Sequence, residues 1–305
     1  MKKQANIIHS KKLPTLKYDV TVFDLISLFK GKVLLSNILP VFTGLWLALY
    51  FNNLVITGHL IDIVFTITGS TLLMAGALTI NNWYDADIDR LMERTQSRPT
   101  VTGSIPLHIV LSTGVTFSII GFLCLLFLSY VSAIYGFIGW FTYVVLYTMW
   151  SKRKYTWNTL IGSISGAVTP LIGWAVISPT FHVVPITLAI ILFIWQMPHT
   201  YAIAIRKKQE YNRANVPLLP VVRGITLTKR RMLLYVSCLL PFPFFLSSIG
   251  PLFVLSITIL NITWLMMAAQ GFSSKNNAQW ARTMFLYSVN YIVILFSLII
   301  IFTLV

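Results

Sequence analysis

The chain has 305 residues, of which 56% are hydrophobic and only 10% are charged, and its net charge is +15. Soluble domains usually contain about 25% charged residues, so this composition excludes an ordinary soluble protein and predicts an all-α integral membrane protein. The excess of 23 basic over 8 acidic residues is compatible with a nucleic-acid partner. The basic residues lie between long apolar stretches, however, and this placement argues against a nucleic-acid partner.

Residues 1–32 form a basic segment ahead of the first long apolar stretch, and they contain seven lysines. A cleavable signal peptide is not expected, because the basic start leads into a polar-interrupted sequence and not into a compact apolar core. Within this segment, residues 18–32 place Val22, Ile26 and Phe29 at helical spacing among charged residues. This pattern predicts an amphipathic helix that lies on the inner surface of a membrane.

Nine apolar stretches follow, each close to the roughly 20 residues that a helix needs to cross a bilayer. They are residues 33–52, 61–82, 107–130, 134–150, 158–178, 183–205, 232–249, 251–272 and 284–304. We therefore predict one membrane-embedded domain over residues 1–305, built as a bundle of nine transmembrane helices.

The basic residues all fall in alternate links between these stretches. Residues 1–32 hold seven of the 23 Lys and Arg residues, and the links 83–106, 151–157, 206–231 and 273–283 hold three, three, eight and two. Cytoplasmic segments of membrane proteins carry the excess of Lys and Arg, so these links and the N-terminus are expected to be cytoplasmic. With nine spans, the C-terminus is then expected outside the cell. The chain is therefore predicted to be a multi-pass protein of the cell membrane, and its basic links are expected to contact lipid headgroups.

Acidic side chains are concentrated at the inner end of the second stretch, where half of the eight Asp and Glu residues lie between positions 85 and 93. On a helix Asn81, Asp85 and Asp89 recur every four residues, so their oxygens share one face. Two carboxylates one turn apart repel each other unless a cation lies between them. Mg²⁺ suits this geometry, because it takes one or two carboxylates and leaves its other positions to water and phosphate oxygens. We expect Asp85 and Asp89 to bind Mg²⁺, with Asn81 orienting them; the other interpretation is a charge run paired in a solvated loop.

Several cationic and polar side chains extend this candidate site. Arg94 and Arg98 are one turn apart if the helix continues, and guanidinium groups can bind phosphate oxygens through two hydrogen bonds. Lys152 lies in the next basic link, and Asn158 at the inner edge of the fifth stretch is expected to face the same cavity. Together these residues describe a site for a magnesium diphosphate.

A second polar cluster ends the sixth stretch. Pro198 removes a backbone hydrogen bond and is expected to kink or end this helix, which would turn His199 toward the cavity. A direct role for His199 and a purely structural hydrogen bond are both open. Lys208 follows in a long basic link and is a second candidate for binding phosphate. The two long polar links, after the second and sixth stretches, predict one central cavity that opens to the cytoplasmic side.

These residues together resemble a known family. The segment Asn81–Arg90, with residues 92–95 and 98–99, resembles the first aspartate-rich motif of the intramembrane aromatic prenyltransferases. Other segments are similar to the branch of that family that farnesylates protohaem: residues 150–153, 156–159, 170–174, 195–199, 201–205, 210–211, 214–215 and 217–220. The resemblance spans nearly the whole chain from about residue 33 and includes the plan of nine helices.

The resemblance implies an enzyme that transfers farnesyl from farnesyl diphosphate to a vinyl group of protohaem (haem B), which is a substrate and not a cofactor. It implies Mg²⁺ as the cofactor, and haem A synthase or proteins of terminal oxidase assembly as candidate partners. The implied catalytic residues are Asn81, Asp85, Asp89 and His199, and the implied substrate-binding residues are Arg94, Arg98, Lys152, Asn158, Lys208, Glu210 and Tyr211.

One departure from the family pattern concerns the second long link. Quinone-forming members carry a further pair of aspartates there, whereas this chain has only Glu210 among basic residues. The resemblance therefore implies metal binding chiefly at Asp85 and Asp89.

Several alternatives stay open at this point. A different enzyme, a prenyltransferase for an aromatic quinone precursor, would use the same first motif. A non-catalytic haem or lipid carrier would use the same cavity without needing Asp85. His199 has three possible roles, as a base for the last proton, as a ligand of the haem iron and as a partner of a haem propionate.

Overall fold

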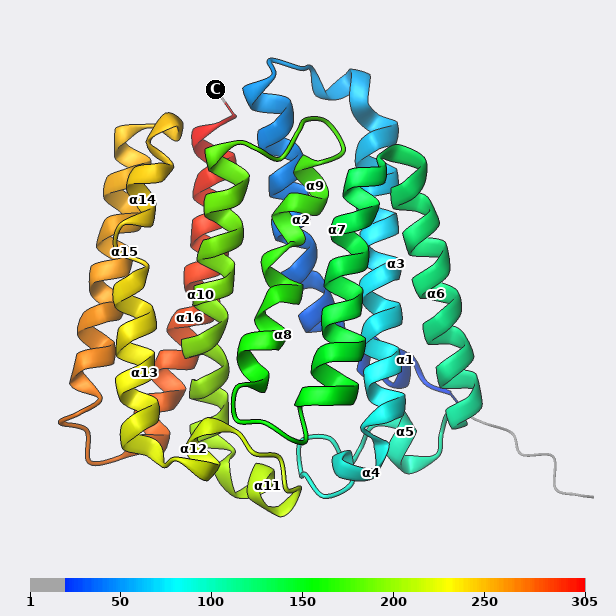
Figure 1. The fold of residues 1–305 in the computed structure, drawn as a ribbon, viewed down its shortest axis with the longest axis vertical. Helices are drawn as coiled ribbons and strands as arrows, with labels where there is room; N and C mark the ends of the chain where they lie inside the picture. Colours follow the sequence, from blue (N-terminus) through cyan, green and yellow to red (C-terminus); the bar gives the residue numbers. More distant parts are fainter. Residues whose placement is uncertain (1–19, 305) are drawn as a thin grey trace, which may run out of the picture.

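The computed structural model describes residues 20–304 as a bundle of long, roughly parallel helices (Figure 1). Within this range the chain forms only helices, turns and loops, as the sequence predicted. The first half contains α1 (Val22–Leu28), α2 (Gly31–Phe51), η1 (Ile56–His59), α3 (Leu60–Tyr84), α4 (Ala86–Asp89), α5 (Pro99–Thr102), α6 (Leu107–Leu128), α7 (Tyr130–Phe141) and the π-helix η2 (Thr142–Ser151). The second half contains α8 (Asn158–Ala167), α9 (Thr169–Trp174), α10 (Val183–Arg206), α11 (Lys208–Arg213), α12 (Leu219–Val222), α13 (Ile225–Cys238), α14 (Phe242–Phe245), η3 (Ser247–Ile249), α15 (Pro251–Gln270) and α16 (Asn277–Phe302).

Seven helical stretches in the described part of the chain are long and apolar enough to cross a membrane, which identifies an integral membrane protein. The other two predicted stretches are interrupted helices, so nine continuous spans are not confirmed. Residues 158–178 form α8 and α9, and Pro170 lies at the start of α9. Residues 232–249 include the end of α13 and all of α14, with Pro241 and Pro243 between and inside them. Proline interrupts a helix because its ring nitrogen carries no hydrogen to donate.

The helix α1 corresponds to part of the amphipathic helix predicted over residues 18–32. It begins with a capping box, in which Thr21 and Asp24 each bond the backbone N–H of the other. Phe23 and Ile26 are exposed, and Leu28 is buried. An exposed apolar face beside a charged one is the pattern of a helix at a membrane surface. The basic residues 1–17, and positions 18 and 19 of the predicted helix, lie outside the described residues.

Two apolar cores divide the bundle. The larger core joins α10, α13, α15 and α16 with the C-terminal ends of α2 and α9, and the smaller one joins α2, α3, α6, α7 and α9. The interrupted pair α8–α9 lies where these two cores meet, since α9 packs along α2 and α8 packs beside α10. The space between the cores is therefore bounded by helices from both halves of the sequence.

The contact between α2 and α9 is close enough to need glycine on both helices. A Cβ atom added to Gly44 would lie 2.0 Å from the carbonyl oxygen of Pro170, and one added to Gly173 would lie 1.9 Å from that of Val41. Both obstacles are backbone atoms, which cannot move without shifting a helix. The two glycines therefore fix α9, and with it one wall of the space between the cores.

We predict that Gly173→Ala lowers the free energy of unfolding by about 3 kcal/mol or more, because the added methyl group must push α9 away from α2. Thermal unfolding of the purified protein in detergent measures this change. The control is Gly58→Ala, where an added Cβ has open space. Equal stability of the two variants would contradict the close packing.

Candidate functional site

The acidic residues at the end of α3 keep their spacing although the helix stops. Tyr84 is the last residue of α3, and Asp85 links it to α4. The backbone N–H of Asp85 still bonds the carbonyl oxygen of Asn81 at 3.0 Å, and that of Asp89 bonds the carbonyl oxygen of Asp85 at 2.9 Å. The helical repeat therefore continues through the junction. The four-residue spacing of Asn81, Asp85 and Asp89 thus survives in the structure.

The helix does not continue to Arg94 and Arg98, so these arginines do not have the spacing of one helical turn that a continued helix would give them. After Asp89 the chain turns, and the Thr95 hydroxyl donates to the carbonyl oxygen of Asp89 at 2.8 Å. Arg98 comes back to the site as the N-cap of α5, where its guanidinium bonds the Asp89 carboxylate. Arg94 is exposed in the intervening turn. The turn thus brings Arg98, and not Arg94, onto a carboxylate.

Asn81 is the centre of a buried hydrogen-bond network. Its side-chain amide donates to Asp85 Oδ2 at 2.8 Å and to Thr148 Oγ1 at 2.9 Å. The side-chain oxygen Oδ1 of Asn81 accepts a hydrogen bond from the ammonium group of Lys30. The amide thus fixes one oxygen of Asp85, and the role of Asn81 in orienting metal ligands stays a prediction. Neither Thr148 nor Lys30 was predicted as part of the site.

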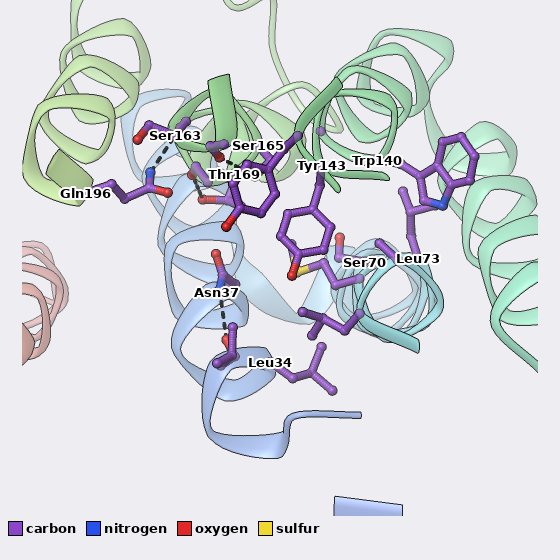
Figure 2. Close-up of a pocket in the computed structure, with 18 of the residues that line it drawn as sticks. Leu34, Asn37, Ser70, Leu73, Trp140, Tyr143, Ser163, Ser165, Thr169 and Gln196 are labelled. Atoms are coloured by element: carbon purple, nitrogen blue, oxygen red, sulfur yellow. Dashed lines mark hydrogen bonds between the residues drawn. The ribbon is translucent and has the colours of Figure 1, made fainter. Parts of the chain in front are cut away.

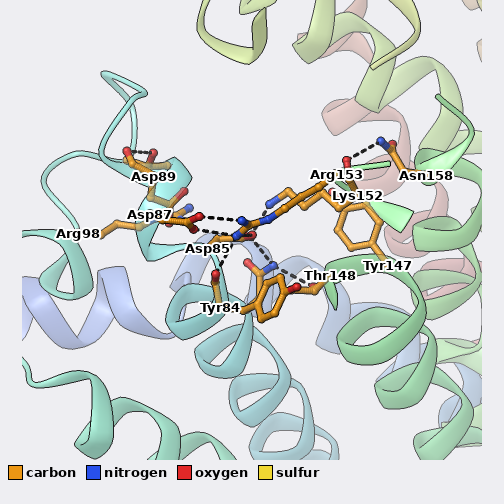
Figure 3. Close-up of polar contacts among 12 residues, drawn as sticks. Tyr84, Asp85, Asp87, Asp89, Arg98, Tyr147, Thr148, Lys152, Arg153 and Asn158 are labelled. Carbon is orange, nitrogen blue, oxygen red and sulfur yellow. Dashed lines mark hydrogen bonds and ion pairs between the residues drawn. The ribbon is translucent and has the colours of Figure 1, made fainter. Parts of the chain in front are cut away.

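The π-helix η2 brings Thr148 and the residue after the helix to the end of α3. Its wider turns are seen at its end, where the backbone N–H of Lys152 bonds the carbonyl oxygen of Tyr147, five residues earlier, at 2.9 Å. Beyond it, the ammonium group of Lys152 bonds Asp85 Oδ2 (Figure 3). Extended π-helices are rare, and π-helical turns occur frequently at functional sites.

Every carboxylate of the cluster meets a cation. Lys152 pairs with Asp85, Arg98 pairs with Asp89, and Arg153 forms two bonds of 2.7 and 2.8 Å to Asp87. The bonds from Arg153 lower the pKa of Asp87 below its ordinary value. Asp85 and Asp89 are almost fully buried, and the removal of a carboxylate from water is costly unless a cation is paired with it.

The two lysines of the cluster respond to it in opposite ways. Burial disfavours the Lys152 ammonium, but its charge attraction and hydrogen bond to Asp85 outweigh burial and raise its pKa. Burial, with repulsion from Arg98 and Lys152, lowers the pKa of Lys30 well below its ordinary value. Of these two lysines, Lys30 is therefore the one whose positive charge is less well compensated by the cluster.

A cavity of about 250 Å³ lies beside this cluster, between α2, α3, α7, η2, α8, α9 and α10 (Figure 2). Its walls are largely apolar and contain the rings of Trp140, Tyr143 and Tyr147. Tyr147 joins the cavity to the charged cluster, because the Lys152 ammonium lies 6.0 Å from the centre of its ring. The Ser70 hydroxyl is buried, lines the cavity and has no hydrogen-bond partner among the described residues.

Asn158 is held in a supporting place. It is fully buried, and its amide donates to the carbonyl oxygen of Lys152 at 3.2 Å. The residues of α8 that line the cavity are Thr159, Gly162, Ser163, Ser165 and Gly166. Asn158 therefore fixes the turn that carries Lys152. It is not one of the residues that line the cavity, although its position at the inner edge of the fifth stretch predicted that it would face the cavity.

The two long links pack against each other at one end of the bundle (Figure 1). Ile88 and Met92 of the first link share a small apolar core with residues of the second, and Tyr211 packs against it. Glu210 is buried and bonds Lys207 at 2.5 Å, while Lys208 begins α11. The structure thus brings α11, with Lys208, Glu210 and Tyr211, next to the acidic segment.

His199 is placed differently from the sequence prediction. The helix α10 runs through Pro198 to Arg206, as membrane helices can when neighbouring groups compensate for proline. His199 Nδ1 lies 2.8 Å from the Ser288 hydroxyl of α16, and its ring stacks on Trp195 at 4.7 Å. Gln196 and Thr200, four residues apart, form the face of α10 that lines the cavity. The adjacent face, which includes His199, meets α16 instead.

The donor atoms of the cluster fit Mg²⁺ better than a metal that needs several protein ligands. In residues 20–304 no group of three or more His, Cys, Asp or Glu side chains is placed to hold a metal ion. Mg²⁺ requires only one or two carboxylates and takes water or phosphate oxygens for the rest. Asp85 Oδ1 is buried and accepts no hydrogen bond from the described residues, so it is available as such an oxygen.

Comparisons with known proteins identify a family and related sequences. Residues 37–289 match the sequence profile of the UbiA prenyltransferase family. A protoheme IX farnesyltransferase of Bacillus licheniformis is 50% identical over 281 residues, which are 92% of this chain and 91% of that protein. Protoheme IX farnesyltransferase 2 of Bacillus subtilis strain 168 is 50% identical over 282 residues, 92% of each chain.

Solved structures show the same fold at low sequence identity. A digeranylgeranylglyceryl phosphate synthase structure has a TM-score of 0.72 at 18% identity and covers 92% of this chain and 98% of its own. A UbiA homolog from Archaeoglobus fulgidus bound to GPP and Mg²⁺ has a TM-score of 0.65 at 14% identity, with 90% and 99% covered.

We predict that Lys152→Met lowers the free energy of unfolding by about 3 kcal/mol, because Asp85 loses its ammonium partner and stays buried. Denaturation of the protein in detergent measures the loss. The double variant Lys152→Met with Asp85→Asn should recover most of it, since the buried charge is gone as well. Lys154→Met, at an exposed position of the same link, is the control. If the Lys152 and Lys154 variants are equally stable, the ion pair between Lys152 and Asp85 does not contribute to the free energy of unfolding.

Proposed function

This chain belongs to the UbiA prenyltransferase family, and on that premise we propose that it farnesylates protohaem. The substrates are farnesyl diphosphate and haem B, and the product carries the hydroxyethylfarnesyl group of haem O. The observation that supports this proposal most is the 50% sequence identity to two protoheme IX farnesyltransferases, over about nine tenths of each chain. The charged cluster and the apolar cavity supply the two environments that this amphipathic substrate needs.

The charged cluster is proposed to bind the diphosphate. Asp85 and Asp89 would hold Mg²⁺, and Asn81 keeps Asp85 in position through its amide. Bound Mg²⁺ would neutralise part of the charge on the leaving group. Lys152 and Arg98 occupy the carboxylates in this structure, and they are close enough to turn to phosphate oxygens when substrate arrives. Fixed cations that meet the departing diphosphate lower the barrier to breaking the C–O bond.

The cavity is proposed to take the farnesyl chain. When the C–O bond breaks, the electron pair leaves with the diphosphate, and an allylic cation remains against the ring faces of Tyr143 and Tyr147. The terminal vinyl carbon of haem bonds to that cation, and water adds to the new cation beside the macrocycle. The proton of that water passes to a carboxylate at the rim; Glu210 is the candidate, because Oε2 has no hydrogen-bond partner among the described residues. His199 is then assigned to joining α10 to α16.

The remaining substrate contacts are proposals from the sequence. Arg94, Lys208 and Tyr211 lie on the two links that pack together beside the cluster, and they are proposed to bind the diphosphate or the haem propionates. Asn158 contributes indirectly, through the turn that carries Lys152.

We propose that the chain is one domain with nine spans, in which the interrupted pairs α8–α9 and α13–α14 also cross the bilayer. The basic links with α4, α5, α11 and α12 lie at one end of the bundle, and the C-terminus lies at the other (Figure 1). The positive-inside rule then places the N-terminus and the open side of the cavity in the cytoplasm, and the C-terminus outside the cell membrane. Because the farnesylated product stays in the bilayer, haem A synthase or a protein of terminal oxidase assembly is proposed to receive it.

We predict that Asp85→Ala and Asp89→Ala each reduce farnesyl transfer at least a thousandfold, because the diphosphate loses its metal. Mass spectrometry of haem extracted from membranes supplied with protohaem, farnesyl diphosphate and Mg²⁺ measures the product. Glu93→Ala, at an exposed position four residues on, should keep near-normal activity. Normal transfer by the Asp85 variant would favour the haem or lipid carrier over the enzyme.

We predict that a chelator such as EDTA stops transfer and that added Mg²⁺ restores it, while the protein stays folded. The same assay, run with an aromatic quinone precursor in place of haem, separates the two enzymes. Prenylation of the quinone precursor without any farnesylated haem would replace the proposed function with the quinone alternative.

A further inference from the structure

Lys30 lies in a strained turn, and its side chain reaches into the charged cluster. It joins α1 to α2 with φ 49° and ψ 53°, a left-handed conformation that is uncommon for residues with a side chain. Its ammonium group crosses to α3 and donates to the side-chain oxygen Oδ1 of Asn81. Strained backbone of this kind persists only where surrounding contacts hold it, and it is concentrated at functional sites.

Three contacts hold this turn in place. The amide of Asn82 donates to the carbonyl oxygen of Leu28 at 2.7 Å. Phe29 stacks on Phe117 of α6 with ring centres 5.5 Å apart, and Leu28 is buried beside it. The neighbouring residues Asn81 and Asn82 therefore divide two tasks, since one meets the Lys30 ammonium and the other fixes the turn that carries it.

The charges of the cluster show what Lys30 adds. Among the described residues it contains four cations and three carboxylates. They are Lys30, Arg98, Lys152 and Arg153, and Asp85, Asp87 and Asp89. Each carboxylate already has a cation from the other three, whereas the contact of Lys30 is with a neutral amide. Of these four side chains, Lys30 alone has no carboxylate partner in residues 20–304. Its positive charge, together with a divalent cation, would balance that of a trianionic diphosphate.

We propose that Lys30 is a substrate-binding residue whose ammonium group moves from Asn81 to a phosphate oxygen when the prenyl diphosphate binds. The inference rests on the proposed function and adds to it a cation supplied by the turn after α1. Exchange of an amide partner for an anionic oxygen strengthens the hydrogen bond, because charge-assisted bonds on both sides are the strong ones. No carboxylate has to be released for this exchange, in contrast to Lys152 and Arg98.

The test measures binding of inorganic pyrophosphate to the purified protein in detergent by calorimetry, in the presence of Mg²⁺ and without haem. Lys30→Gln, which keeps a donor for Asn81 but no charge, and Lys30→Met should each weaken binding about 10- to 100-fold. Lys30→Arg should restore most of the affinity. Lys32→Met, two residues on and exposed, is the matched control and should bind as the wild type does. In turnover assays the KM for farnesyl diphosphate should rise in the Gln variant, while haem binding, followed by absorbance, should not change.

Two results would overturn the inference, and they differ in what they say of the reaction. If Lys30→Gln and Lys30→Met bind pyrophosphate as tightly as the wild type and lose only thermal stability, Lys30 serves the α1–α2 turn alone and the proposed function stands. If the folded wild-type protein itself binds no magnesium pyrophosphate, the proposed function fails together with the role of Lys30.

Discussion

Two carboxylates buried at the rim of an apolar bundle are the constraint on which the rest of the site depends. A charge removed from water is costly unless a partner compensates for it, and Asp85 and Asp89 are almost completely covered. The chain meets this requirement with side chains from four separate segments. Arg98 comes from the start of α5, Lys152 follows η2, and Asn81 and Lys30 complete the network from α3 and the turn before α2. The cluster therefore forms only when these four segments come together in the folded protein.

Lys152 and Arg98 compensate for the charge of the two aspartates in this structure. In the proposed reaction the same two cations would turn to a diphosphate that lies beside the aspartates. Charges placed in advance near a leaving group are the largest contribution to many enzymatic rate enhancements. The adjoining cavity has apolar and aromatic walls. An environment suited to a hydrocarbon chain and one suited to a phosphate group therefore lie side by side.

Hydropathy and spacing predict much of this molecule, and the parts they miss have physical reasons. The repeat of Asn81, Asp85 and Asp89 was predictable because backbone hydrogen bonds continue across the end of α3. Interruptions at prolines divide two of the predicted spans, since hydropathy measures burial in lipid and not helix continuity. The face of His199 depends on the angle of α10 within the bundle, which one sequence does not contain. Thr148 lies in an apolar run that gives no local signal, because its role comes from a contact with α3.

The wide turns of η2 make the residue count of this segment as important as its chemistry. Ten residues span Thr142–Ser151, and the five-residue hydrogen bonds set the direction in which the chain leaves the bilayer. Loss of one residue there would return the backbone to ordinary winding and rotate everything beyond it by about 100°. The ammonium group of Lys152 would then no longer point toward Asp85. Exposed apolar side chains of this segment can be replaced by other apolar ones without changing the path of the backbone. An insertion or deletion would instead remove Lys152 from the site. We therefore expect relatives to have no insertions or deletions at these positions.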